Sequence, residues 1–197
     1  MNSGFYPIAI FFASIFTNNI LLANYLGMCS FLSISRELKT SLGLGVAVTF
    51  VMAVTAPLNW IVYKYVLLPL DLDYLRFIVF IIVIAAFVQI VEMIIERVSE
   101  SLYAALGIFL PLITVNCAIL GASLFMIIRN YDLLSSFMFG LGSGLGWMMA
   151  ILAMAGIRQK IARARVPKGL EGAGITLIIT GMMALAFMGF SGMINIS

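Results

Sequence analysis

Two cysteines, Cys29 and Cys117, are the residues of this chain best suited to redox or metal chemistry, and both lie inside long apolar stretches. The sequence contains no histidine and no Cys-x-x-Cys spacing. Those absences exclude a haem bound through histidine, a zinc site of the Cys/His kind and a redox motif of the thioredoxin kind. Two thiolates by themselves supply at most half of a four-ligand metal site.

The positions of the two cysteines leave three roles open. Buried cysteine ordinarily packs as a small apolar side chain, and two neighbouring thiols can also form a disulfide. The third role follows from helix-interrupting residues: asparagines within residues 18–24 precede Cys29, and Pro111 and Asn116 precede Cys117. A half-helix that begins at an interruption points unpaired N–H groups toward it, where they stabilise thiolates or sulfides. This placement favours a metal pair completed by two thiolates of a second chain.

Glu92 is the candidate for an ion or proton path. It lies in the apolar stretch that ends at Arg97, four residues before Glu96, so the two carboxylates share one face of a helix. Glu96 beside Arg97 fits the headgroup level of a membrane. Glu92 is one turn deeper, and it either snorkels toward the surface or lines an ion or proton path.

A glycine-rich run is expected to serve helix packing. Gly140 and Gly144 form one Gly-x-x-x-Gly pair, and Gly142 and Gly146 form another. Pairs of this kind let membrane helices approach closely. No Lys-Ser or Lys-Thr follows the run, so it does not resemble a phosphate-binding loop.

The elements that position these residues are membrane helices. Of the 197 residues, 63% are hydrophobic and 10% are charged, and the mean hydropathy is +1.17, which is more apolar surface than a soluble domain of this length can bury. One crossing needs roughly 20 apolar residues. Six spans are predicted, at about residues 5–33, 41–68, 75–97, 103–128, 134–157 and 173–194. The first span is long, and we expect it to be broken within residues 18–29.

The lysines and arginines predict the orientation. Eight of the eleven lie in the loops after the first, third and fifth spans, five of them within residues 158–168, and three lie on the opposite side. By the positive-inside rule these three loops are cytoplasmic and both termini lie outside. The same bias accounts for the net charge of +3 and the pI of about 9.0. We therefore expect a lipid bilayer, and no nucleic acid, as a partner of the chain. The basic loop could also dock an acidic soluble protein.

The two halves of the chain resemble each other. Each begins with a long span that carries asparagine and then cysteine, and each continues into a glycine-rich span, at residues 42–45 and 141–144. Three spans followed by three spans place the second half upside down relative to the first. The predicted fold is an all-α integral membrane protein of six transmembrane helices. These form two inverted three-helix repeats, residues 1–98 and 99–197, in one membrane domain, with the first and fourth helices interrupted.

Four segments carry a resemblance to a known family: residues 19–29, residues 106–118, the run Gly-Ser-Gly-Leu-Gly-Trp at 142–147, and residues 181–192. They resemble the membrane proteins that include the E subunit of the sodium-translocating NADH:quinone oxidoreductase and the A subunit of the Rnf complex. The run at 142–147 is closer to the E subunit. The similarity covers almost the whole chain.

The resemblance implies one subunit of a six-subunit complex in the bacterial inner membrane, with periplasmic termini, paired with the homologous D subunit. It implies a 2Fe-2S cluster with two cysteine ligands from each of these two chains, here Cys29 and Cys117. It further implies that the complex passes electrons from NADH through flavins to ubiquinone, coupled to sodium export, with the NADH, flavin and quinone sites mainly on other subunits. The residues implied to surround the cluster are Gly27, Met28, Asn116 and Ala118.

Two other functions stay open at the level of sequence. One is the A subunit of an Rnf ferredoxin:NAD oxidoreductase, which differs in its electron donor. The other belongs to a different class, a small inverted-repeat transporter of an ion or solute with Glu92 as its coupling group.

Overall fold

The computed structural model describes residues 5–98, 110–163, 167, 169–170 and 172–189, and these residues form helices and turns without any strand. The all-α prediction is therefore confirmed for this part of the chain. The predicted spans that begin near residue 103 and end near residue 194 extend partly outside it.

The first predicted span is divided into three short helices, α1 (Phe5–Ile15), α2 (Ile20–Asn24) and α3 (Met28–Ile34). Asn19 ends the first interruption by capping α2, because its Oδ1 accepts hydrogen bonds from the next backbone N–H groups, at 3.1 and 3.4 Å. Gly27 precedes α3 with a φ of 84°, a left-handed conformation that glycine adopts without strain. The predicted break between residues 18 and 29 is confirmed.

Two long helices follow. Helix α4 (Leu38–Val62) continues into a π-helical turn, Tyr63–Leu67, and contains Pro57 without a break. A short 3-10 turn, Asp73–Leu75, then leads into α5 (Arg76–Val98).

The second interruption separates α7 (Leu110–Thr114) from α8 (Cys117–Ile128). The sequence pointed to Pro111 as a cause of this break, but Pro111 lies inside α7 and the break follows at residues 115–116. Asn116 ends it, because its Oδ1 accepts the Ala118 N–H at 3.0 Å and caps α8. Asparagine, and not proline, marks both breaks.

Helix α9 (Leu133–Ile161) is the longest helix described, and α10 (Ala173–Met188) follows it. The first Gly-x-x-x-Gly pair of α9 lies against α4. A Cβ on Gly140 would lie 2.6 Å from the Met52 carbonyl oxygen, and a Cβ on Gly144 would lie 2.6 Å from the Thr49 Cα. Both glycines are therefore required for the close approach of α4 and α9.

The second pair lies against α1. A Cβ on Gly142 would lie 2.7 Å from the Phe11 carbonyl oxygen, and one on Gly146 would lie 3.0 Å from the Ile15 carbonyl oxygen. The predicted packing role is thus confirmed, with one pair for each of two neighbouring helices.

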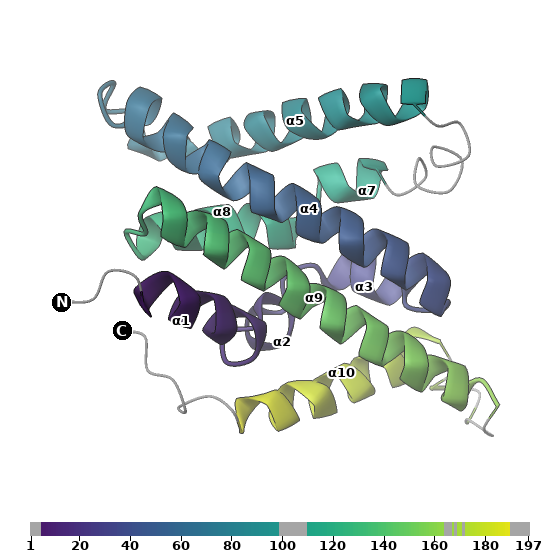
Figure 1. Ribbon diagram of the computed structural model, residues 1–197. Coiled ribbons are helices and arrows are strands. Elements are labelled where there is room, and N and C mark those ends of the chain that lie inside the picture. The colour runs from purple at the N-terminus through teal and green to yellow at the C-terminus, as the bar shows by residue number, and fades with distance from the viewer. Residues whose placement is uncertain (1–4, 99–109, 164–166, 168, 171, 190–197) are drawn as a thin grey trace.

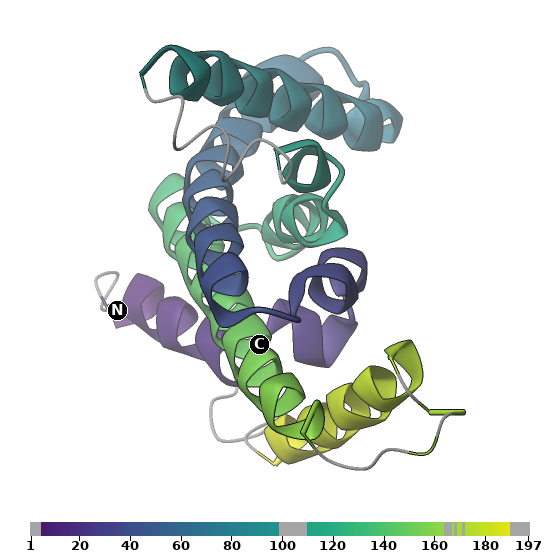
Figure 2. The same cartoon turned by 90° about the vertical axis from the view of Figure 1, so that its right-hand side faces the viewer.

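The helices run back and forth between two ends of the molecule. Figure 1 shows the start of α1, the α4–α5 and α8–α9 connections and the end of α10 at one end, with the α3–α4 connection and the start of α10 at the other. Figure 2 shows α4 and α9 side by side, with α5 across one edge and α10 across the other, and with α3, α7 and α8 on the same side of the α4–α9 pair.

Four segments are long and apolar enough to cross a membrane, and α10 is a shorter apolar helix. The membrane character of the chain is thus borne out, whereas the six-helix inverted repeat, its two halves and the orientation stay predictions. The four segments are Leu38–Leu67, Asp73–Ile94, the interrupted Pro111–Ile128 and Leu133–Ile161.

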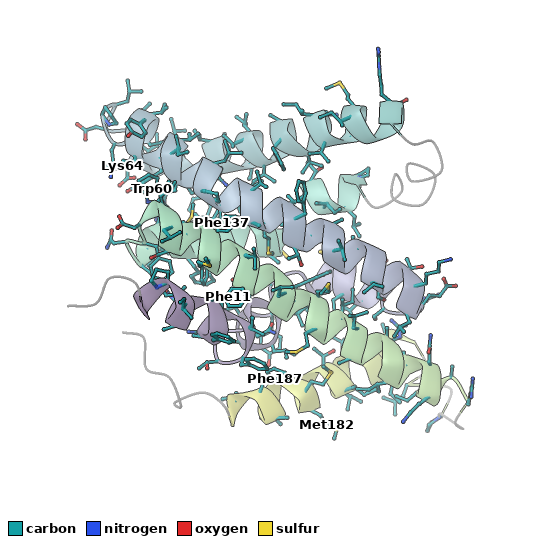
Figure 3. The ribbon with its side chains drawn as sticks, viewed as in Figure 1. Phe11, Trp60, Lys64, Phe137, Met182 and Phe187 are labelled. Carbon is teal, nitrogen blue, oxygen red and sulfur yellow. The ribbon has the colours of Figure 1, made fainter. Side chains whose placement is uncertain are left out.

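An aromatic and basic pair lies at the far end of α4. The Lys64 ammonium is 4.6 Å from the centre of the Trp60 ring, and Figure 3 shows both side chains at that end of the helix. The Trp60 indole N–H also donates to the Tyr131 carbonyl oxygen at 2.7 Å. Tryptophan and lysine in this arrangement are typical of the level where a membrane helix meets the headgroups.

Candidate functional site

The two helix breaks meet in space at Gly27 and Cys117. The Gly27 backbone N–H donates to the Cys117 Sγ at 2.9 Å, across 90 positions of sequence. A Cβ on Gly27 would lie 2.5 Å from the Trp147 Nε1, 3.0 Å from the Ala118 Cβ and 3.3 Å from the Asn116 Oδ1. Only glycine fits this position, and we call these five residues the junction.

The two cysteines occupy the first turns of short helices, Cys29 as the second residue of α3 and Cys117 as the first residue of α8. Both are free thiols, so no disulfide joins them. Cys117 is half-buried, whereas Cys29 is exposed and has Ser30 Oγ at 3.8 Å. The sequence suggested that both thiols are buried. Cys29 instead is exposed at the surface of the chain.

Two buried nitrogen donors lie at the junction. Asn116 is 2% exposed and Trp147 is 0% exposed. Within the described residues, neither the Asn116 Nδ2 nor the Trp147 Nε1 has a hydrogen-bond acceptor. Nothing in the sequence assigns a role to the Trp147 N–H, because a contact with a glycine 120 positions away leaves no local signal.

Helix α3 is held at its other end by Arg158 of α9. The Arg158 Nη1 donates to the Leu32 carbonyl oxygen at 2.9 Å and to the Ser35 Oγ at 2.8 Å. A cation at the C-terminal end of a helix satisfies free carbonyl groups and interacts favourably with the helix dipole. In the sequence, Arg158 belongs to the basic segment 158–168 that predicts the orientation. An arginine at the end of a long apolar span also indicates a contact of this kind. The contact fixes the short helix that carries Cys29.

Comparison with known proteins agrees with the resemblance seen in the sequence. The model of the Rnf-Nqr subunit family, described as membrane proteins, matches residues 7–194. The chain belongs to the Rnf-Nqr family.

Three bacterial relatives of this Rnf-Nqr chain are each described as the E subunit of a Na(+)-translocating NADH-quinone reductase. The proteins from Serratia proteamaculans, Psychromonas ingrahamii and Proteus mirabilis are 54%, 53% and 53% identical to it. Each alignment covers 94% of this chain and 96% of the relative. The similarity thus extends over nearly the full length on both sides.

The ligand set of this Rnf-Nqr chain is incomplete for a metal. Among the residues that the structure describes, no group of three or more cysteine, aspartate or glutamate side chains could hold a metal ion. The junction does offer a thiol at Cys117 and unused N–H donors, and a second thiol, Cys29, lies two residues after Gly27 on α3. This donor set fits half of a thiolate-bound centre that is sealed by another chain.

Glu92 lies on α5, which carries none of the five junction residues in this Rnf-Nqr chain. It is half-buried on α5, at the edge of the bundle opposite α10, and Glu96 and Arg97 are exposed. No hydrogen bond or ion pair connects Glu92 to the junction within the part of the chain described. The structure therefore brings together Gly27, Asn116, Cys117 and Ala118, and does not bring Glu92 to them.

Proposed function

We propose that this chain is an E-type membrane subunit of a sodium-translocating NADH:quinone reductase, and that it relays electrons across the membrane. In this proposal Cys29 and Cys117 are two of the four ligands of a 2Fe-2S centre, and a homologous D-type subunit provides the other two. The observation that carries the proposal is the hydrogen bond from Gly27 N–H to Cys117 Sγ, which places one cysteine against the segment that leads to the other.

The surroundings of the two thiols support a site shared between chains. Cys117 is partly covered by its own chain, whereas Cys29 is open to a neighbour. Backbone N–H groups at the starts of α3 and α8 stabilise negative charge on sulfur. A 2Fe-2S centre there would store an electron partway across an apolar core of about 30 Å. The residues Gly27 and Ala118 keep this region closely packed.

The same proposal assigns the remaining chemistry to other chains. Sites for NADH, flavin and ubiquinone belong mainly to other subunits of a six-subunit complex, and sodium is the transported ion. The complex lies in the bacterial inner membrane, with both termini of this chain in the periplasm. The excess of lysine and arginine in the loops after the first, third and fifth predicted spans supports that orientation.

The test is to replace each cysteine in the intact complex. We expect Cys29→Ser and Cys117→Ser to abolish a 2Fe-2S electron paramagnetic resonance signal and to lower the iron content by two atoms per complex, because serine is a poor replacement for thiolate. Ser33→Ala is the matched control, since Ser33 is exposed on α3 one turn after Cys29. It should leave iron and signal unchanged.

An unchanged signal and iron content in both cysteine variants would overturn the iron–sulfur proposal. Sodium transport that continues without any membrane-bound iron would instead favour a small transporter. Electron donation by ferredoxin and not by NADH would identify the Rnf relative.

A further inference from the structure

The junction contains two buried nitrogen donors that lack a hydrogen-bond acceptor among the described residues. Five buried side-chain atoms lack a hydrogen-bond partner in the described part, and three of them are oxygens, on Asn59, Ser136 and Ser143. The other two are nitrogens, the Trp147 Nε1 and the Asn116 Nδ2. Both buried nitrogens without an acceptor thus lie at the junction.

An unpaired N–H in an apolar interior has a high free-energy cost, about 1–3 kcal/mol by protein mutagenesis. The orientation of the Asn116 amide is fixed, because its Oδ1 accepts the Ala118 N–H at 3.0 Å. The Nδ2 group therefore remains free for another acceptor. Trp147 approaches so closely that Gly27 must lack a side chain, since a Cβ would lie 2.5 Å from the indole nitrogen.

One N–H group is bonded to the Cys117 sulfur, and two unpaired N–H groups lie next to the residues of that bond. Gly27 already donates to Cys117 Sγ at 2.9 Å. The Trp147 nitrogen lies against the same glycine, and Asn116 is the residue directly before Cys117. An acceptor for the Trp147 and Asn116 donors would lie beside Gly27 and Cys117, and sulfur atoms of an iron–sulfur centre are acceptors of the required kind.

We propose that the Trp147 indole N–H and the Asn116 amide N–H donate hydrogen bonds to the sulfur atoms of the redox centre and raise its reduction potential. This inference rests on the proposed iron–sulfur function. N–H donors stabilise the reduced form more than the oxidised form, because the reduced centre carries one more negative charge. The two side chains set the potential and do not transfer protons.

The test uses Trp147→Phe in the intact complex, which keeps a buried aromatic ring and removes the N–H. We expect the 2Fe-2S signal to remain and the reduction potential to fall. At a fixed applied potential the reduced-to-oxidised ratio should drop about tenfold, which is ~59 mV for one electron. Asn116→Ser keeps an oxygen that can cap α8, and it should lower the ratio by a smaller factor.

The chain offers a matched control because it has two tryptophans. Trp60→Phe also removes an indole N–H, but that group donates to the Tyr131 carbonyl oxygen away from the junction. It should leave the potential unchanged. A Trp147→Phe complex with a wild-type signal and a wild-type potential would overturn the inference and leave the iron–sulfur function intact.

A second measurement covers the case in which Trp147→Phe loses the centre. Wild-type complex labelled with indole ¹⁵N should show a weak nitrogen coupling to the reduced centre in pulsed electron paramagnetic resonance. The coupling should persist in Trp60→Phe. Its absence from the wild type would overturn the role of Trp147. Absence of any 2Fe-2S signal from the wild type would instead overturn the proposed function itself.

Discussion

The two helix breaks use the same residue type in different ways. At the first break, Asn19 caps α2 through its Oδ1 and also uses its Nδ2, which donates to the Ile15 carbonyl oxygen at 3.2 Å and to the Gly146 carbonyl oxygen at 2.8 Å. At the second break, Asn116 caps α8 through its Oδ1, but its Nδ2 has no acceptor among the described residues. Both asparagines are almost fully buried.

At the first break the asparagine amide is fully bonded within the chain, whereas at the second break one N–H donor group has no acceptor among the described residues. The Asn19 amide forms hydrogen bonds with α1, α2 and α9, so it has no N–H group left to donate to a ligand. Asn116 keeps a donor beside Cys117, where the simple role of a cap would not require it. A break in a membrane helix is thus more informative when its polar groups are not all satisfied within the chain.

The largest effect is expected from Gly27→Ala, which would push the two breaks apart. An alanine at position 27 would have to adopt a backbone φ of 84°, and its Cβ would lie 2.5 Å from the Trp147 nitrogen. Strain and overpacking together should cost roughly 2–5 kcal/mol of folding free energy. Thermal unfolding of the purified complex measures the loss.

The control for that substitution is Gly156→Ala on α9, where an added Cβ would meet nothing within 4 Å. Alanine there should be neutral or stabilise by about 0.5–1 kcal/mol, because glycine is a poor helix former. If Gly27→Ala were as stable as Gly156→Ala, the close contact between the breaks would be wrong.

A smaller effect should separate the two asparagines. Asn19→Ala removes two cap bonds and two bonds to carbonyl oxygens and should cost about 2–3 kcal/mol of stability. Asn116→Ala removes a single cap bond but also the unpaired Nδ2 group, so it should cost no more than about 1 kcal/mol. Paired unfolding curves would test the order, and equal losses would remove the distinction between a structural and a functional break.

The smallest effect on stability is expected from Glu92→Gln, which lies outside both breaks. We predict that this change slows sodium-coupled turnover more than it reduces assembly, because a carboxylate in a membrane segment favours an ion-path role. Glu96→Gln is the control, since Glu96 is exposed. Sodium dependence identical to wild type in Glu92→Gln would contradict a role of this carboxylate in the ion path.

Local sequence signals predicted much of the helical framework. Apolar length predicted where α4, α5 and α9 lie, because a crossing needs a fixed number of apolar residues. Asparagine and glycine predicted the break before Cys29, since they stabilise caps and left-handed backbone locally. Proline misled at the second break, because Pro111 is accommodated within α7.

The contacts between distant segments could not be predicted in the same way. The spacing of Gly140 and Gly144 predicted close packing, but it did not reveal that this pair meets α4 and the alternate pair meets α1. The approach of Trp147 to Gly27 also depends on tertiary packing. Composition shows that a tryptophan is apolar enough for the interior, and it says nothing about whether its N–H finds an acceptor.

The exposure of Cys29 also has a consequence for its reactivity. In the chain by itself this thiol lies at the surface, so alkylating and oxidising reagents that enter the membrane can reach it. Under the proposed function, a D-type partner that binds over α3 would cover Cys29 and end that exposure.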